Sequence, residues 1–309
     1  MSTVTFESGS KMPVNGFGIW RVEPAVVMRA LRTAFDVGYR HIDSAMIYMN
    51  EPEAGKVFEE YFGGDSPKVK REDVFITSKL WNSCHAKDKV VEACRKSLED
   101  LKLDYLDLYL VHFPISWKCG GLPLTENNWL LKTEDGYPQF TTDVSLKDTW
   151  EGMEECVRLG LVKNIGVSNY PVFSLCDLMN YCKIKPAVNQ CECHVMNQRE
   201  DLRKVCNKFG IHYTAYSILG SGKSGPLEDE TVLKIAEKHG ASPAQICIAW
   251  GLAQGVSVLA KSSTDSRIKS NFAAEKIKLS ENDLKELKKL DKGLCVCDPK
   301  EYWGFPALA

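Results

Sequence analysis

The chain has 309 residues, of which 44% are hydrophobic and 26% are charged, as is typical of a folded globular protein rather than a disordered one. Its formal net charge of −2 gives no overall attraction for nucleic acid or for an anionic membrane, so any anion site must be local. Because the N-terminus lacks a signal-peptide pattern and no run of about 18 apolar residues occurs, we expect a cytoplasmic protein without a membrane span.

Twelve cysteines are spread along the chain, too thinly for a disulfide scaffold, so free thiols are expected. The closest groups are Cys191 with Cys193 and Cys295 with Cys297, each separated by one residue. Structural zinc sites usually place about two to four residues between paired cysteines. No metal site is therefore predicted.

In chain order, residues 4–6 and 12–14 resemble a small hairpin around Ser-Gly-Ser, which we expect to cap the floor of a larger sheet. Short apolar runs then alternate with longer segments whose apolar residues recur every three or four positions, the pattern of strands joined by helices. The candidate strands are 16–20, 40–43, 74–79, 106–112, 164–168, 187–190, 212–217 and 256–261. The clearest helical segments are 24–37, 87–101, 146–159 and 227–239. Pro24, at the start of the first of these, and Ser242-Pro243 have the pattern of helix starts.

Eight strands with intervening helices and no Pro/Gly-rich linker favour an α/β fold of the closed (β/α)8 TIM-barrel type over an open doubly wound sheet. Residues 1–309 are expected to form one barrel domain. Two further segments lack a clear period or a predictable geometry: the connection 114–142 and the C-terminal residues 294–309. We expect both to act as specificity loops.

Polar residues end most of the candidate strands. They are Asp43, Lys79, His112, Ser168-Asn169, Gln190, Tyr216-Ser217 and Lys261-Ser262. Any one of these is readily explained by a strand end meeting solvent. Together they indicate a site, because barrel enzymes carry their chemistry at the carboxyl ends of the strands.

Three motifs carry a resemblance to a known family: Asp43-Ser-Ala-Met-Ile-Tyr48, Thr77-Ser-Lys79-Leu-Trp81 and Leu110-Val-His112-Phe-Pro114. In this order they resemble the aldo-keto reductases, the aldose and xylose reductases in particular. The likeness extends from Gly16 through Ile165-Gly-Val-Ser168-Asn169 to Pro306.

The resemblance implies a catalytic set of Asp43, Tyr48, Lys79 and His112. Tyr48 would donate a proton to the carbonyl oxygen, and the Lys79 ammonium, held by Asp43, would lower the pKa of this phenol. His112 would orient the substrate oxygen. A structural Asp–Lys ion pair and a buried core histidine are the alternatives.

The resemblance also implies a nicotinamide site. Ser168, Asn169 and Gln190 would hold the carboxamide, Tyr216 would stack on the ring, and a glycine-containing loop at 217–224 would close over the pyrophosphate. No G-x-G-x-x-G fingerprint occurs, and Ser217 stands where a nucleotide-triphosphate loop needs glycine. The residues expected around the phosphates and adenosine are Ser217, Leu219, Ser221, Lys261, Ser262, Thr264, Arg267 and Asn271.

Lys261 and Arg267 suit a ribose 2′-phosphate, which favours NADPH over NADH, although a solvated basic helix start is the alternative. Ala260 replaces a common proline of the family, and Ser270 replaces a common acidic residue, so NADH stays open. Asn169 before Tyr-Pro could equally serve a turn.

The substrate pocket is expected to be apolar, formed by Trp20, Trp81, His112, Phe113 and Trp303, although these aromatic residues could instead be packing residues. The predicted function is NADPH-dependent reduction of aldehydes or aldose sugars to alcohols. The alternatives are a ketone, prostaglandin or steroid reductase of the same family, or a nucleotide-binding regulatory protein with little turnover. A small carbonyl substrate is the expected partner, with no nucleic acid or membrane, and a monomer is favoured.

Overall fold

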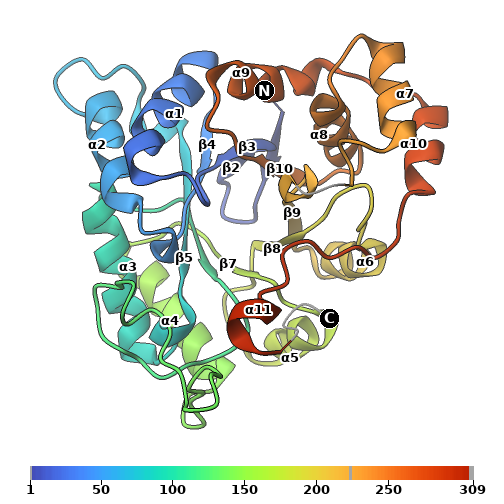
Figure 1. Ribbon diagram of the computed structural model, residues 1–309. Helices are drawn as coiled ribbons and strands as arrows, with labels where there is room; N and C mark the ends of the chain where they lie inside the picture. The colour runs from blue at the N-terminus through green and yellow to red at the C-terminus, as the bar shows by residue number, and fades with distance from the viewer. Residues whose placement is uncertain (1, 223–224, 306–309) are drawn as a thin grey trace.

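The computed structural model describes residues 2–222 and 225–305. Among these residues, eight parallel strands form a closed barrel in the order β3 to β10, with β10 paired to both β3 and β9 (Figure 1). The strands are β3 Asn15–Gly18, β4 His41–Asp43, β5 Phe75–Leu80, β6 Leu108–Val111, β7 Ile165–Ser168, β8 Val188–Glu192, β9 His212–Tyr216 and β10 Ser257–Ala260. Each corresponds to one predicted strand, so the predicted TIM barrel is confirmed.

Helices surround the barrel and cover its strands. They are α1 Pro24–Val37, α2 Glu51–Phe62, α3 Lys87–Leu101, α4 Leu146–Arg158, α5 Val172–Tyr181, α6 Glu200–Phe209, α7 Glu230–His239, α8 Pro243–Ala253, α9 Asp265–Ala273, α10 Glu281–Lys288 and the short α11 Lys300–Trp303. The local sequence explains several helix starts. Ser242 caps α8 in a capping box with Gln245, and Pro243 occupies the first turn of that helix. Ser145 caps α4 in a capping box with Asp148.

The N-terminal hairpin closes one end of the barrel. Strands β1 Thr3–Thr5 and β2 Lys11–Pro13 pair in antiparallel register. Behind them, Phe6 and Met12 pack on the first residues of barrel strands, among them Phe75 and Leu108. The prediction that a hairpin caps the barrel floor is therefore confirmed.

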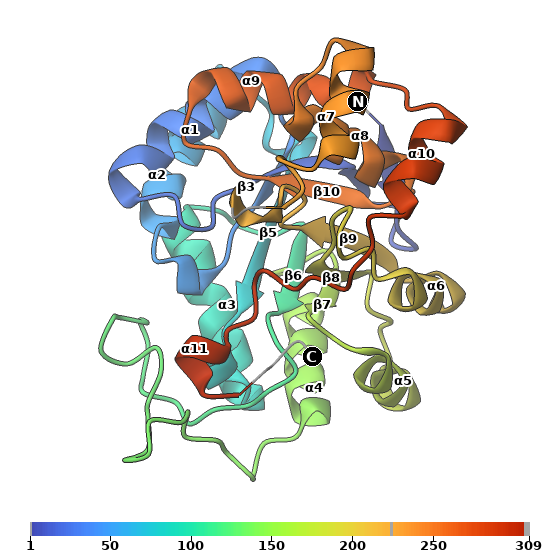
Figure 2. The same ribbon diagram turned by 45° about the vertical axis from the view of Figure 1, so that its right-hand side comes forward.

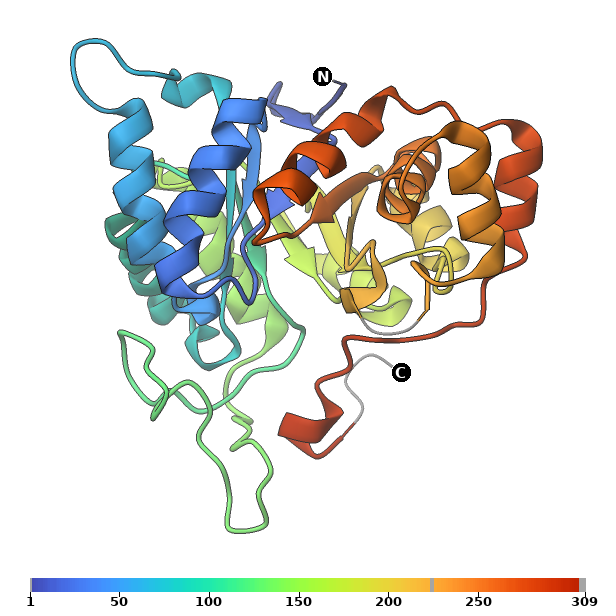
Figure 3. The same cartoon turned by 45° about the horizontal axis from the view of Figure 1, so that its top comes forward.

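The opposite end carries the two segments expected to act as specificity loops. The connection 114–142 contains no helix or strand, and its only pairings among the described residues are isolated bridges such as Trp117 with Phe140. In all three views this connection lies beside α11, away from the N-terminus (Figures 1, 2 and 3). The C-terminal segment differs from a plain loop because α11 forms within it, and residues 306–309 lie outside the described part of the chain.

Candidate active site

Four side chains from separate parts of the chain converge at the carboxyl end of the barrel. The Lys79 ammonium, on β5, donates hydrogen bonds to Asp43 Oδ1 at 2.6 Å and to the Tyr48 hydroxyl at 3.1 Å. The ring of Tyr48 lies 5.9 Å from the ring of His112. Asp43 ends β4, and Tyr48 follows it in the turn Met46–Tyr48. The structure therefore brings the predicted catalytic set together.

The Asp43–Lys79 pair is buried and fully hydrogen-bonded. Lys79 also donates to the backbone carbonyl of Ser44 at 2.7 Å, and the second oxygen of Asp43 accepts from Gln190 Nε2 at 2.7 Å. A buried ion pair is tolerated only when such additional bonds compensate for lost hydration. The ammonium is thus held at a fixed position beside the phenol.

Burial controls the proton affinities of this site. Burial, helped by the negative charge of Asp43, raises the pKa of the Tyr48 phenol well above its ordinary value near 10. The net shift is therefore opposite to the lowered pKa expected from the sequence, because burial is its largest cause. Burial also lowers the pKa of Lys79, although Asp43 opposes this shift. At neutral pH Tyr48 is consequently a protonated phenol, the form that can donate a proton.

His112 follows β6 and is neutral at neutral pH. Burial lowers its pKa well below the ordinary value, and the nearby charge of Lys79 adds to this effect. Its buried Nδ1 atom finds no hydrogen-bond partner among the described residues. The imidazole therefore keeps hydrogen-bonding capacity that the protein itself does not use.

Aromatic rings line the space beside His112. Trp81 lies 5.3 Å from the His112 ring and 6.2 Å from Phe113, and Phe113 lies 4.7 Å from Trp303 on α11. Trp20, also predicted for the pocket, is partly exposed and carries the Arg21 guanidinium 4.4 Å above its ring. Trp81, Phe113 and Trp303 thus form one aromatic group with His112, whereas Trp20 is not part of it.

The polar residues predicted for the nicotinamide form one network. Asn169 adopts a positive φ of 61°, donates to the His112 carbonyl at 2.9 Å and accepts from the Tyr216 hydroxyl at 2.7 Å. Ser168 donates to the Gln190 carbonyl at 2.7 Å. This network joins three strand ends, β7, β8 and β9, to the residue that follows β6. Asn169 therefore both occupies a turn conformation and takes part in the network at the candidate site.

The segment expected to close over a pyrophosphate meets the C-terminal segment. Ser217 and Ser221 both contact the Cys297 sulfur, at 2.9 and 3.0 Å. Leu219 lies between them and is partly buried. Lys223 and Ser224, which belong to the predicted loop, lie outside the described residues.

The start of α9 has the features of an anion site. Thr264 occupies the N-cap without a side-chain hydrogen bond to the helix, so backbone N–H groups of the first turn stay available. Lys261 and Arg267 are exposed and form no ion pair with any described carboxylate. Ser262 receives the Thr264 N–H at 3.1 Å, and Asn271 is buried further along α9. These residues fit a phosphate group.

Several site residues were missed by sequence reasoning. Trp117 and Trp129, from the 114–142 connection, lie 5.4 and 6.0 Å from Trp81. The sequence does hold a signal for these two residues, because tryptophans are unusual in an otherwise polar loop. Glu192, at the end of β8, accepts hydrogen bonds from the backbone N–H groups of Val296 and Cys297 at 2.8 and 2.9 Å. No local pattern could have predicted that partner.

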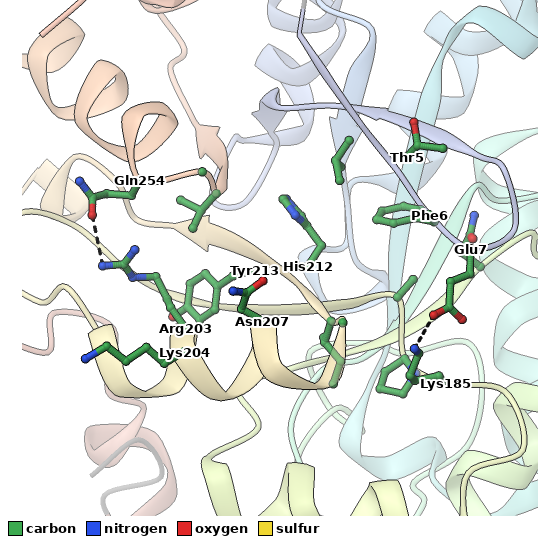
Figure 4. Close-up of a pocket in the computed structure, with 18 of the residues that line it drawn as sticks. Thr5, Phe6, Glu7, Lys185, Arg203, Lys204, Asn207, His212, Tyr213 and Gln254 are labelled. Atoms are coloured by element: carbon green, nitrogen blue, oxygen red, sulfur yellow. Dashed lines mark hydrogen bonds and ion pairs between the residues drawn. The ribbon is translucent and has the colours of Figure 1, made fainter.

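A large cleft lies at the amino-terminal end of the barrel. This cleft of about 1090 Å³ opens between the hairpin, α6 and the start of β9, where Lys185 pairs with Glu7 and Arg203 with Gln254 (Figure 4). It contains none of the predicted site residues. Volume alone therefore does not make it the active site.

Two further features are absent from the described residues. No group of three or more His, Cys, Asp or Glu side chains is arranged to hold a metal ion there. No helix in that part of the chain is both long and apolar enough to span a bilayer.

Comparison with known proteins agrees with this geometry. The model of the Aldo/keto reductase family matches residues 9–292. The chain is 42% identical over 317 residues to the NADP-dependent D-sorbitol-6-phosphate dehydrogenase of Malus domestica, covering 100% of both chains. It is 42% identical to Aldose reductase B of Dictyostelium discoideum, covering 96% of this chain and 94% of that relative.

A solved structure shares the fold along the whole barrel. The aldose reductase of Giardia lamblia has a TM-score of 0.90 and 40% identity, covering 96% of this chain and 99% of that one. The chain therefore belongs to the aldo/keto reductase family, whose members are oxidoreductases that reduce carbonyl groups with a nicotinamide cofactor.

Proposed function

We propose that this protein reduces aldehydes and aldose sugars with NADPH, and that Tyr48 donates the proton. The observation that carries the proposal is the hydrogen bond of 3.1 Å from the Lys79 ammonium to the Tyr48 hydroxyl, within an aromatic pocket. When bound, the reduced nicotinamide supplies the hydride.

The chain's own residues complete the reaction. A substrate carbonyl lying between Tyr48 and His112 would accept a hydrogen bond from the neutral imidazole, which fixes its direction. As negative charge develops on the carbonyl oxygen, the phenol transfers its proton to it. The Lys79 ammonium then stabilises the phenolate that remains, and Asp43 holds the ammonium in place.

The residues fit an NADPH molecule on two grounds. Asn169, Gln190 and Ser168 form an amide-rich network at the barrel mouth, suited to a carboxamide. About α9, two cations without carboxylate partners in the described chain suit a 2′-phosphate.

Substitution of Tyr48 by Phe tests the proposed acid. Loss of the general acid is expected to lower kcat for glyceraldehyde or xylose about 10²–10⁴-fold, while NADPH binding, followed by fluorescence quenching, is kept. Tyr181→Phe is the matched control, because its buried hydroxyl has no hydrogen-bond partner among the described residues. Turnover by Tyr48→Phe at the wild-type rate would exclude Tyr48 as the donor.

Substitution of Arg267 by Met tests the proposed cofactor preference. Loss of a charge-assisted hydrogen bond of about 1.5–3 kcal/mol is expected to raise the KM for NADPH about 10–100-fold and to leave the KM for NADH nearly unchanged. Lys269→Met, an exposed cation further along α9, is the control. Equal changes in both KM values would show that Arg267 does not read the 2′-phosphate.

A substrate panel separates the alternatives. It should compare glyceraldehyde, xylose and glucose 6-phosphate with ketones, prostaglandins and steroids, because the same four catalytic residues suit all of them. Glucose 6-phosphate is included because a relative is named for a sorbitol 6-phosphate substrate. NADPH binding without turnover of any of these would favour a regulatory protein.

A further inference from the structure

Two thiols meet where the 114–142 connection crosses the barrel. Cys84 lies in the 3-10 turn Asn82–Cys84 directly after β5, and Cys119 lies in the connection. The backbone N–H of Trp117 donates to the Asn82 carbonyl at 3.0 Å, which holds the two segments together. At this crossing the Cys84 and Cys119 side chains are hydrogen-bonded to each other. Cys84 is fully buried, whereas Cys119 is exposed.

The surroundings of Cys119 favour its thiolate. The hydrogen bond from Cys84 is the largest cause that lowers the pKa of Cys119, which falls to about 6. The backbone N–H of Gly121 also donates to this sulfur, at 3.4 Å, and the nearby Lys89 charge adds to the effect. Burial instead raises the pKa of Cys191 and Cys247 to about 12. Of the two thiols, Cys119 is therefore the accessible one, and its surroundings favour the thiolate.

The position of this pair links it to the substrate pocket. Trp117 stands two residues before Cys119 and packs on Trp81 at 5.4 Å, and the Trp81 indole donates to the Trp129 carbonyl at 2.8 Å. Trp81 itself contacts His112. A covalent bond at Cys119 would therefore restrict the segment that carries two tryptophans of the pocket wall.

We infer that Cys119 and Cys84 form a redox pair, in which Cys119 reacts with a hydroperoxide and Cys84 resolves the product into a disulfide that fixes the 114–142 connection on the barrel. An accessible thiolate beside a resolving thiol is the arrangement found at redox-sensing cysteines. The chemical step stands independently of the proposed reductase activity. Its effect on turnover rests on that activity.

The reaction balances with the hydroperoxide as the only co-reactant. The Cys119 thiolate attacks one peroxide oxygen, the O–O bond breaks, and an alcohol, or water in the case of hydrogen peroxide, leaves with a proton. The Cys84 sulfur then attacks the Cys119 sulfenic sulfur, the S–O bond breaks, and water leaves as the S–S bond forms. Two thiols are oxidised, and the hydroperoxide is reduced by two electrons.

Mass spectrometry of the whole protein tests the chemical step. After treatment with hydrogen peroxide, non-reducing peptide mapping of the wild type should show one linked peptide pair that joins Cys84 to Cys119 and lacks two hydrogen atoms. Cys176→Ser, which removes an exposed thiol on α5, should give the same linked pair. Cys84→Ser should instead leave a sulfenic acid on Cys119 that dimedone traps.

The opposite results are equally definite. Oxidation of wild-type Cys119 to a sulfinic acid without the linked pair, or oxidation of Cys176 as fast as Cys119, would overturn the assignment. The wild-type map needs no variant, so a folding defect in Cys84→Ser would not prevent the test.

Kinetics of the same samples test the consequence. Oxidation should change the KM for a bulky aldehyde at least about threefold, a thiol reductant should reverse the change, and Cys119→Ser should not respond in this way. Effects that persist in Cys119→Ser belong to other thiols. A linked pair with an unchanged KM would refute control of the pocket. If no aldehyde is turned over, the proposed function fails while the peptide map still decides the redox pair.

Discussion

The four side chains proposed to be catalytic show how burial sets the chemistry of single residues. Lys79 is almost completely shielded from solvent and keeps three hydrogen-bond acceptors, Asp43 Oδ1, the Ser44 carbonyl and the Tyr48 hydroxyl. Removing either member of such a pair leaves an uncompensated buried charge, at a typical cost of about 3–5 kcal/mol. Loss of activity in variants of Asp43 or Lys79 must therefore be separated from loss of folding.

Glu51 provides a stability prediction at the residue scale. It is buried at the start of α2, and its Oε1 atom accepts hydrogen bonds from Ser44 at 3.0 Å and Ser78 at 2.6 Å. Burial nevertheless raises the pKa of Glu51 from 4.5 to about 7. The folded state thus binds this proton more tightly than the unfolded state, and the free energy of unfolding falls as pH rises from about 4.5 to about 7.

Glu51→Gln should remove this pH dependence, because an amide oxygen can still accept from both serines. We expect the variant to gain about 2–3 kcal/mol relative to the wild type between pH 5 and pH 8, measured by urea unfolding at both values. Glu53→Gln, on the same helix but partly exposed, is the control. An equal pH dependence in the wild type and in Glu51→Gln would contradict the buried-acid interpretation.

At the scale of elements, one carboxylate holds the C-terminal segment on the barrel. Besides the N–H groups of Val296 and Cys297, Glu192 accepts from His194 Nε2 at 3.0 Å and from the Cys295 thiol at 3.4 Å. These bonds overcome the effect of burial and lower the pKa of Glu192. The segment held in this way continues into α11, which carries Trp303 to the pocket.

Glu192→Gln should loosen the C-terminal segment, because the amide nitrogen cannot accept from a backbone N–H. An unsatisfied donor costs about 1–3 kcal/mol, so we expect faster limited proteolysis after residue 290 and a several-fold higher KM for bulky aldehydes. Glu200→Gln, a partly exposed carboxylate on α6, should behave as the wild type. Unchanged proteolysis and KM in Glu192→Gln would show that the segment is held by other contacts.

At the scale of the whole molecule, stability and chemistry lie at opposite ends of the barrel. The hairpin seals the amino-terminal end through Phe6 and Met12, while the proposed catalytic residues lie at the carboxyl end. Barrel enzymes carry their active sites at the carboxyl ends of the strands, so residues at the opposite end can contribute to stability alone.

Met12→Ala should separate the two properties. Because Met12 is fully buried, truncation is expected to lower the free energy of unfolding by about 2–5 kcal/mol while kcat and KM of the folded enzyme stay unchanged. Lys11→Ala, an exposed neighbour in β2, should change stability by less than about 0.5 kcal/mol. A changed KM in Met12→Ala would reveal coupling between the two ends.

The sequence by itself determined the barrel strands and several helices, and it predicted the residues of the candidate site. Apolar runs alternating with helical periods predicted every barrel strand, and the helices Pro24–Val37 and Lys87–Leu101 were predicted at their observed bounds. Such patterns are local, since each element must present an apolar face to a core. The polar strand ends followed from the same reasoning, because parallel strands in a barrel end on one rim.

Only the tertiary structure decided which distant groups meet and how strongly water is excluded from them. Trp117 and Trp129 reach Trp81, Glu192 finds residues about a hundred positions later, and Cys119 finds Cys84, all through irregular segments without a periodic pattern. The direction of the Tyr48 pKa shift likewise depends on burial, which is its largest cause. Periodicity determines which side of an element faces inward, whereas contacts between loops and the loss of hydration depend on the whole folded chain.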